Sequence, residues 1–578
     1  ENVFAVEVHN VDSTSSDMSG LFFLSFELPE GVSYYGTPPD WFFVPTEFST
    51  SHLPIVVVNT NGQDIPNDNK ITAHMGIIDN GPGETNHLSD PYNHYDGFIG
   101  IELRGSSTLW FPKKQFAVET RDSLGENNNV SLFGMPEEND WIFNAPYTDK
   151  SLMRNVLIYN MARDAGRYAS RTHYFELVLN DDYRGVYVML EKVKRDDNRV
   201  DISKLEPDEL SGDDVTGGYI IKIDKWDGEN LGGWYSEPQL ENYSGFYYQY
   251  HYPKPDEIAP EQQEYIINYI DDFEQVMNSE NYMNTTSGYP SIIHWDSFVD
   301  FLIMQEITKN VDGYRLSSYL YKDIDSNDGR LVAGPIWDFN LGFGNANYDE
   351  GWDTQSWMID LTEHIWAEYD WYVPFWWCLI WSDERFQSSV SKRWHDLRQT
   401  TLSDNYVNAV IDSLHDHIGE AANRNFERWP ILGEYVWPNY FIGETYEEEV
   451  EYLRDWIMTR MEWMDNELLA TRGNSHLAPE AFSLNPIYPN PFNRSASIQY
   501  LMPKDANIKL DIFNAKGVHI YRLFEGDKRA GIYTLSWDGK NNNGQEVSSG
   551  VYIILLQENN MQYNQRHYTE TRKVILVK

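Results

Sequence analysis

Two aspartates beside a predicted hairpin are the residues of this sequence that best suit chemistry on a phosphate group. Asp312 lies in TKNVDGYRLSSYLYKD (residues 308–323) and Asp338 in GPIWDFNLGFGN (residues 334–345). A hairpin between them would bring both carboxylates to its open end. Phosphoryl transfer needs such a pair, because one carboxylate orients the attacking hydroxyl and the other holds the metal that bridges the phosphates. In an acidic chain any hairpin carries carboxylates near its ends, so the pair alone leaves a structural role open.

Common catalytic signatures are missing from the sequence. It contains no GxxxxGK[ST] phosphate loop, no GxSxG nucleophile elbow and no HExxH helix, which argues against P-loop and ordinary hydrolase chemistry. His415 and His417 lie in a polar, helical region and are not expected to hold a metal. The single cysteine, Cys378, excludes an intrachain disulfide and a cysteine-based zinc site.

The chain is strongly acidic. Its 578 residues include 90 Asp and Glu against 44 Lys and Arg, a formal net charge of −46. Such a field repels nucleic acid and anionic membrane surfaces and attracts divalent cations. The sequence has no run of 18 apolar residues, so no membrane span is expected. It begins at Glu1 without a leader, as a mature exported protein would, and we expect a secreted or cell-surface location; a chain trimmed for another reason would look the same.

The first half of the chain is rich in predicted strands. Residues 1–53 alternate apolar and polar side chains and predict a short N-terminal β extension. A helix is predicted over residues 151–166, where apolar residues recur at helical spacing and Gly166 provides a stop. Strands are predicted around it at residues 54–60, 98–105, 114–120, 174–180 and 184–193.

The second half becomes helical and aromatic. Residues 445–469 predict one amphipathic helix, because their apolar residues follow steps of three and four. Strands at 317–323 and 329–339 form the hairpin beside the two aspartates. A β-rich lobe followed by a helical lobe indicates a two-lobed α+β domain over residues 54–470.

The C-terminal part has a different composition. Residues 471–485 are polar and irregular, which is typical of a linker. Residues 486–578 contain short strands at regular spacing with Gly and Asn turns between them, and they predict an all-β sandwich.

Several blocks of the sequence resemble, in order, those of the CotH (spore coat protein H) kinase-like proteins. The resemblance spans roughly residues 54–470 and implies an atypical protein-kinase fold. It also implies ATP as phosphoryl donor, Mg²⁺ or Mn²⁺ as metal, and secreted or surface proteins as acceptors. The matching blocks are residues 104–120, 149–166, 180–196, 310–323 and 334–344.

The resemblance implies roles for individual residues. Asp312 resembles the catalytic aspartate and Asp338 the metal-binding aspartate. Trp337 resembles the indole that stacks on adenine, with a core tryptophan as the alternative. Lys113 or Lys114 resembles the lysine that contacts phosphate in kinase β lobes, and strand alternation favours Lys114.

Further residues follow from the same resemblance. Arg154 would pair with phosphate or brace the metal-binding aspartate, with a surface salt bridge as the alternative. Glu191 lies where the lobes would join, so that backbone groups there would meet the adenine edge. Asn340 or Asn345 would complete the metal site, unless one ion suffices.

The chain also departs from ordinary kinases. It has no GxGxxG loop over the phosphates, and RGSS at residues 104–107 is the nearest candidate. Ser317 and Ser318 stand where many kinases place a metal-binding asparagine.

The segment DIDSNDGR (residues 323–330) resembles a calcium loop. Its glycine comes one residue late for an EF-hand. A hairpin turn is therefore favoured, with structural Ca²⁺ as the alternative.

The C-terminal residues resemble a FlgD-type Ig-like domain that serves as a type IX secretion sorting module. The resemblance implies an outer-membrane secretion machinery as partner, while a spacer or adhesive sandwich is the alternative. The matching segments are residues 488–493, 508–520, 531–556 and 571–578.

The sequence thus favours a secreted atypical kinase that transfers phosphate from ATP to secreted or surface proteins. The alternative is a catalytically silent cell-surface adhesin or structural protein on a kinase-like scaffold, since a fold does not fix a function. A polysaccharide-degrading enzyme is a third possibility and needs two carboxylates across an open groove.

Overall fold

The computed structural model describes most of the chain beyond residue 46. The predicted N-terminal extension (residues 1–53) lies almost entirely outside the described residues, as does most of the predicted linker at 471–485. The described ranges are 47–225, 232–237, 245–361, 373–473, 482–484, 487, 490–493, 495–502, 506–528, 531–542, 544–558 and 569–578.

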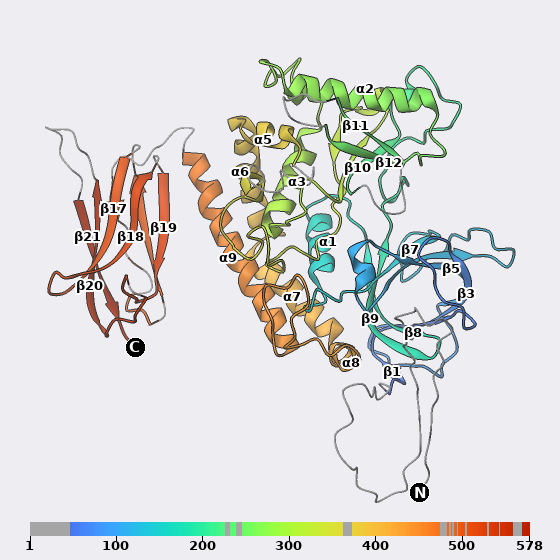
Figure 1. The fold of residues 1–578 in the computed structure, drawn as a ribbon, viewed down its shortest axis with the longest axis horizontal. Coiled ribbons are helices and arrows are strands. Elements are labelled where there is room, and N and C mark those ends of the chain that lie inside the picture. Colours follow the sequence, from blue (N-terminus) through green and yellow to red (C-terminus); the bar gives the residue numbers. More distant parts are fainter. Residues whose placement is uncertain are drawn as a thin grey trace, which may run out of the picture. The chain divides into compact units, whose positions relative to one another are not determined.

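Among the described strands, seven close into a barrel in the order β2, β3, β5, β6, β7, β9, β8 (Figure 1). Neighbouring strands are antiparallel except β2 and β8, which run parallel and pair Ile55 with Glu176. Inward apolar side chains such as Val58, Ile101 and Phe143 are buried and fill the interior. The strands are β2 (Ile55–Asn59), β3 (Ile71–Ile78), β5 (Tyr95–Arg104), β6 (Gln115–Arg121), β7 (Asp140–Asn144), β8 (Thr172–Leu179) and β9 (Asp182–Glu191).

The sequence prediction of this region is confirmed in part. All five predicted strands exist, whereas β3, β7 and the closure of the sheet were not predicted. The predicted helix is α1 (Arg154–Asp164), which joins β7 to β8 and ends before Gly166, whose φ is +90°. Its buried side chains, among them Leu157 and Tyr159, belong to the core shared with the helical region.

A second sheet carries the predicted hairpin. β13 (Ser318–Lys322) pairs with β14 (Val332–Ala333), and the turn between them holds a short 3₁₀ helix at Asp325–Asn327. The other edge of β13 pairs with β10 (Tyr219–Ile223). The remaining strands are β12 (Tyr247–Tyr252) and β11 (Gly233–Tyr235), in the sheet order β11, β12, β10, β13, β14.

Helices and aromatic side chains build the rest of this part. Trp376, Trp377 and Trp394 are buried in the helical core. The predicted amphipathic helix is confirmed as α9. The helices are α2 (Pro260–Met277), α3 (Trp295–Thr308), α4 (Met358–Leu361), α5 (Phe375–Trp381), α6 (Glu384–Arg398), α7 (Asp404–Ile418), α8 (Glu420–Arg428) and α9 (Tyr446–Gly473).

The C-terminal part is all β, as predicted. Three antiparallel strands form one sheet and four form another, and Ile498, Leu510, Trp537 and Ile554 lie in their common core. The sheets are β15 (Ser483–Leu484), β16 (Ala496–Met502) and β19 (Gly531–Trp537), and β18 (His519–Lys528), β17 (Ala506–Asn514), β20 (Gly550–Glu558) and β21 (Thr569–Leu576). With the mixed N-terminal part, this makes the chain an α+β protein.

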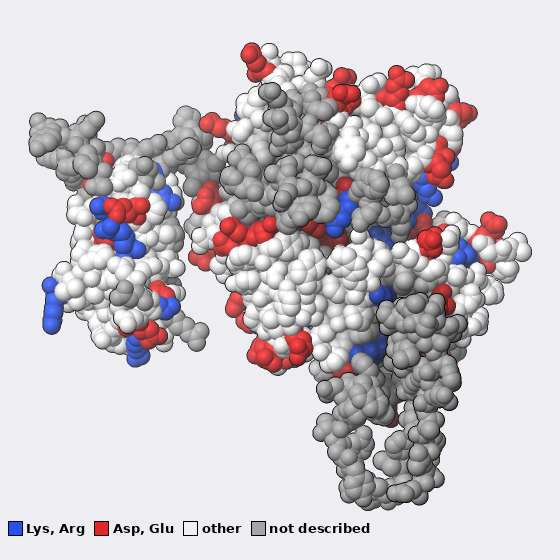
Figure 2. Space-filling model, viewed as in Figure 1, with Lys and Arg blue, Asp and Glu red and all other residues white. Residues whose placement is uncertain are grey.

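Charge is unevenly spread over the surface. Figure 2 shows acidic side chains over the helical region and several basic side chains near the boundary between helices and barrel, on the face that is drawn. None of the described helices combines the length and the apolar character needed to cross a membrane.

Candidate active site

Asp312 lies in the turn that joins α3 to β13. Its backbone N–H donates to Asn310 Oδ1 at 3.3 Å, and its side chain is 22% exposed. Arg315 follows it, with Nη2 4.0 Å from Asp312 Oδ1 and 3.0 Å from Asp349 Oδ2. The closer bond of Arg315 is therefore to Asp349, and the carboxylate of Asp312 is only partly compensated.

Asp338 follows β14 and is held from two sides. Its backbone N–H donates to the Tyr159 hydroxyl at 3.1 Å, and its carbonyl accepts a bond from Asn310 Nδ2 at 3.3 Å. The next N–H, of Phe339, donates to Asn155 Oδ1 at 2.7 Å. Asp338 has φ +59°, a conformation that costs a non-glycine residue free energy unless its surroundings fix it. Helix α1 and the turn after α3 supply that constraint.

The charge of Asp312 acts on Asp338. Desolvation by the surrounding protein raises the pKa of Asp338 to about 6, and the negative charge of Asp312 adds to the rise. The pKa of Asp312 is also raised by the surrounding protein. Asp338 is nevertheless solvent-exposed, so its carboxylate is accessible to a ligand. The structure thus brings the two predicted aspartates into one site.

Cations approach this pair from two strands. Arg104 ends β5, and its charge lowers the pKa of Asp338 against the other influences. Lys225 follows β10 and lowers the pKa of both aspartates. Asp224 beside it raises both and pairs with Lys222, whose Nζ lies 2.9 Å from Asp224 Oδ2.

Sequence reasoning missed most of these neighbours. Residues after β10 reach the site because Ile223 pairs with Ser318 at the start of β13, a contact between distant segments that no local pattern reveals. Asn155 and Tyr159 were detectable in principle, since a spacing of four puts them on one face of a predicted helix. Asn310 gave no signal beyond its proximity to Asp312.

Trp337 is 9% exposed and packs into the site beside Asp338. Its ring stacks on Tyr159, with centroids 6.1 Å apart, and the Arg104 guanidinium carbon lies 5.6 Å from its ring centroid. These contacts fix the indole in the site, and its predicted stacking on adenine stays a prediction.

The two candidate lysines make contacts within the protein. Lys113 is 2% exposed, and its Nζ donates to Val186 O at 2.6 Å and Asn425 Oδ1 at 2.8 Å. Burial lowers the pKa of Lys113 well below its ordinary value. Lys114 is half-buried and donates from Nζ to the Leu109 carbonyl. The bonds of Lys113 therefore join the start of β6 to β9 and α8, whereas the bond of Lys114 fixes the connection between β5 and β6.

Arg154 and Glu191 are also engaged. Arg154 is 1% exposed, and its Nη1 donates to Asp149 Oδ1 at 2.6 Å, so this ion pair is buried rather than on the surface. Glu191 is fully buried and contacts Arg171 Nη1 at 3.0 Å and Arg199 Nη2 at 3.1 Å. The structure places Glu191 in this ionic cluster at the end of β9, apart from the bonds that hold the aspartates.

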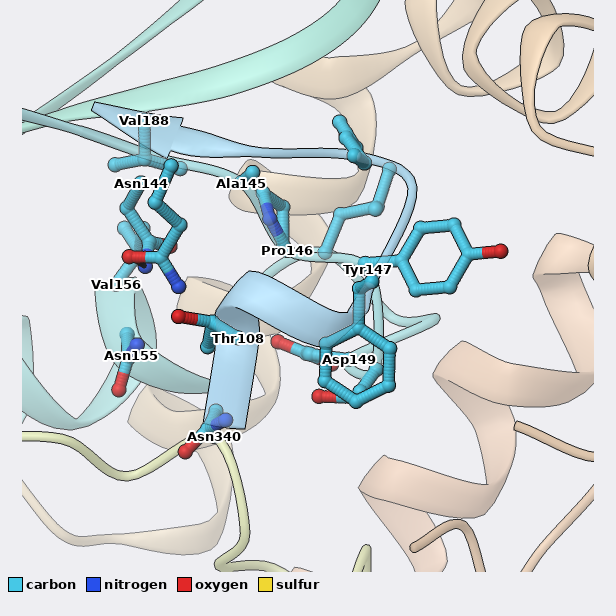
Figure 3. Close-up of a pocket in the computed structure, with 15 residues that line it drawn as sticks. Thr108, Asn144, Ala145, Pro146, Tyr147, Asp149, Asn155, Val156, Val188 and Asn340 are labelled. Atoms are coloured by element: carbon cyan, nitrogen blue, oxygen red, sulfur yellow. Dashed lines mark hydrogen bonds between the residues drawn. The ribbon is translucent and has the colours of Figure 1, made fainter. Parts of the chain in front are cut away.

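A pocket opens between the 3₁₀ helix at Ser107–Trp110, the end of β7 and α1 (Figure 3). Thr108, Asn155 and Asn340 line it together, from three segments. The space inside is about 20 Å³, which suits one or two water molecules. In this conformation the pocket does not admit a purine ring.

The two candidate asparagines differ. Asn345 is 3% exposed, and its Nδ2 donates to Asn340 O at 2.7 Å and Thr148 O at 3.1 Å. Asn439 donates to its Oδ1 at 2.8 Å. The Asn345 amide therefore serves the loop structure, and the partly exposed Asn340 is better placed to meet a ligand.

Protein side chains alone do not form a metal cage here. Within the described ranges, no three His, Cys, Asp or Glu side chains come close enough to bind a cation. Mg²⁺ usually keeps several waters and binds one or two carboxylates together with substrate phosphates. The exposed Asp338 fits that mode, in which nucleotide and metal bind together.

The segment that resembles a calcium loop, residues 323–330, forms the turn between β13 and β14. Asp325 pairs with Lys322 at 2.7 Å, and Asp328 pairs with Arg330. Asp323 accepts bonds from the backbone of Ser203 and Ile324. These contacts support the predicted hairpin turn.

Solved structures match only parts of the chain. Dimeric latent PorU from Porphyromonas gingivalis is 18% identical over 18% of this chain and 10% of its own, with a TM-score of 0.15. FlgD from P. aeruginosa is 20% identical over 14% of this chain and 61% of its own. Alkylpurine DNA glycosylase AlkC from Pseudomonas fluorescens, bound to DNA containing an abasic site analog, is 10% identical over 34% of this chain and 48% of its own. Both have a TM-score of 0.12. The chain covers less than two thirds of each of them, and scores this low carry no argument.

Two family models match the sequence, while no curated protein matches it. The FlgD Ig-like domain matches residues 493–561, within the C-terminal sandwich. The CotH kinase protein model matches residues 101–464, which contain α1, the hairpin and both aspartates. The chain therefore belongs to the CotH kinase protein family and ends in a FlgD-type Ig-like domain.

Proposed function

We propose that this protein is an ATP- and Mg²⁺- or Mn²⁺-dependent phosphotransferase with an atypical, two-lobed kinase-like domain. The observation that carries the proposal is the pair of Asp312, in the turn after α3, and Asp338, after β14, which lie close enough that the charge of Asp312 raises the pKa of Asp338. Family membership supports the same chemistry.

In this proposal the two aspartates have different tasks. A metal ion bound with the nucleotide neutralises charge on the phosphates. Asp338 is exposed and its backbone is held by α1. Its ionised carboxylate would bind that metal ion. Asp312 would accept the proton of the acceptor hydroxyl as its oxygen bonds to the terminal phosphorus and the bond from phosphorus to the leaving oxygen of ADP breaks. A raised pKa makes Asp312 a better base than an ordinary aspartate.

The rest of the proposal concerns location and partners. Secreted or surface proteins would supply the acceptor hydroxyl. The FlgD-type domain would serve as the sorting module read by an outer-membrane secretion machinery, which would place the protein outside the cell or on its surface.

A non-catalytic surface protein is the second candidate, and one observation favours it. Tyr435, Trp437 and Tyr440 are about half exposed between α8 and α9. The Trp437 ring stacks on Tyr348 and the Tyr440 ring on Trp352, with interplanar angles of 4° and 9°. Fixed, exposed aromatic rings are typical of surfaces that bind partners.

Thermal unfolding with and without ATP plus Mg²⁺ or Mn²⁺ separates the two candidates. A ligand at a hundred times its dissociation constant stabilises a protein by about 2.7 kcal/mol, which shifts the midpoint by a few degrees. A shift in the wild type that Asp338→Ala abolishes would support the phosphotransferase. No shift in the wild type at any nucleotide concentration would favour the surface protein.

A further inference from the structure

The cation that meets the nucleotide phosphates is the unassigned part of the proposed site. Both lysines that the sequence suggested donate to protein carbonyls, and Lys113 also to a side chain. A phosphate chain beside Asp312 and Asp338 nevertheless needs positive charge, because both carboxylates repel it. The metal ion would supply part of that charge, and a basic side chain at the site would supply the rest.

Arg104 is placed for this task by its backbone. It is the last residue of β5 and pairs with Gln115 at the start of β6. The chain then turns sharply at Gly105, with φ +107°, where a Cβ would lie 1.8 Å from Thr108 Oγ1. The Thr108 hydroxyl in turn donates to the Arg104 carbonyl at 3.4 Å. Strand pairing and this tight turn together fix the backbone position of Arg104.

The side chain of Arg104 lies over Trp337, and its charge acts on Asp338. Its guanidinium carbon lies 5.6 Å from the ring centroid of Trp337, the residue before Asp338. An indole face attracts and aligns a guanidinium. Arg104 is only half-buried, so a ligand can reach it.

The chemistry of the group suits the ligand. A guanidinium presents a planar fork of donors that matches two phosphate oxygens, and it stays charged at any working pH. Lys222, on β10, pairs with Asp224. Lys225 contributes positive field from the opposite strand.

We infer that Arg104 binds the phosphate chain of the nucleotide, in place of the lysine of ordinary kinases, with Trp337 as the platform that aligns it. This inference rests on the proposed function, because it concerns the same site. In this inference Trp337 stacks on Arg104 of the protein itself, and not on the adenine ring of the nucleotide.

The experiment compares binding of ATP, AMP and adenosine, each with Mg²⁺, to the full chain by calorimetry. Arg104→Gln is expected to weaken ATP binding about tenfold to a hundredfold, the usual cost of a lost hydrogen bond to a charged group. Adenosine binding should change less than twofold, because it lacks phosphate. Arg104→Lys should bind ATP with intermediate affinity. Arg121→Gln, which removes another half-buried arginine of the barrel and its pair with Glu119, is the matched control and should bind like the wild type.

The outcomes separate this inference from the proposed function. If the wild type binds no ATP, both are overturned. If the wild type binds ATP and Arg104→Gln binds it equally well, only the assignment of Arg104 is overturned. A loss confined to Lys114→Gln would likewise overturn it in favour of the lysine. Arg104→Lys keeps the test valid if Arg104→Gln unfolds, since an unchanged ATP-to-adenosine affinity ratio in the lysine variant would contradict a forked contact.

Discussion

Two carboxylates at opposite ends of one segment show how differently this fold treats negative charge. Glu306, in α3, is fully buried and pairs with Arg460 of α9 at 3.2 Å. It also accepts bonds from the Tyr314 hydroxyl at 2.8 Å and from the backbone of Met358 at 2.7 Å. Asp338, by contrast, is exposed and adopts a left-handed φ.

The two carboxylates differ in how far neighbouring donors and cations compensate their negative charge. Glu306 is surrounded by donors, as a buried charge must be if the fold is to tolerate it. The strongest electrostatic influence of another side chain on Asp338 is the repulsion from Asp312. A compensated carboxylate stabilises a structure, whereas an exposed and repelled one is available for a cation from outside. Function is therefore better sought at Asp338 than at the better-bonded Glu306.

The largest expected effect follows from removing the compensated charge. Glu306→Gln should destabilise the protein by about 3–5 kcal/mol, because Arg460 stays buried without its carboxylate. Denaturant unfolding measures the loss. Asp338→Asn is the control and should leave stability unchanged or higher, since it relieves repulsion. Equal destabilisation by both substitutions would contradict the comparison.

The second effect concerns rate instead of stability. Asp312→Asn and Asp338→Asn should each lower phosphate transfer about a hundredfold or more, the usual cost of losing one transition-state contact. Label transfer from ATP, including transfer to the protein itself, measures it. Asp338→Asn should also abolish stabilisation by metal and nucleotide, while Asp312→Asn should retain it. Full activity in either variant would remove that aspartate from the mechanism.

Local patterns predicted much of this fold. Strand alternation and helical spacing located five strands of the barrel, α1, α9 and the hairpin, because each buries one face. Barrel closure between β2 and β8 and the pairing of β10 with β13 depend on segments far apart in sequence, and no local pattern encodes them.

The site shows the same limit. Asp312 and Asp338 were predicted because they flank a local hairpin. Lys113 and Lys114 were assigned by their place on a strand, yet their partners depend on tertiary contacts such as that between Lys113 and Asn425 of α8. Arg104 comes near Asp338 only through the packing of barrel against hairpin.

A third carboxylate sharpens the comparison through pH. Glu274, in α2, is 1% exposed and accepts a bond from the Tyr248 hydroxyl at 2.7 Å. Burial raises its pKa to about 7 from 4.5. The folded state therefore binds a proton that the unfolded state releases between these values, so stability falls as pH rises from 4.5 to 7.

Glu274→Gln should remove that loss. The variant should gain about 3 kcal/mol over the wild type at pH 8 and nothing below pH 4.5. Unfolding midpoints of both proteins across this range measure the difference. The same substitution at Glu306 should destabilise at pH 8, because Glu306 has a cationic partner. A gain independent of pH would show that Glu274 is not the titrating group.

The smallest effect tests how Asp338 is held. Tyr159→Phe removes the hydroxyl that accepts the Asp338 N–H, and it should lower stability by about 1 kcal/mol. It should also weaken binding of Mg²⁺ with ATP several-fold, because the left-handed turn loses one of its constraints. Tyr174→Phe is the matched control, since this buried hydroxyl donates to Leu152 O at 2.9 Å near the start of α1. It should cost similar stability and leave nucleotide binding unchanged. Equal loss of binding in both variants would mean that α1 as a whole, and not this hydrogen bond, positions the carboxylate.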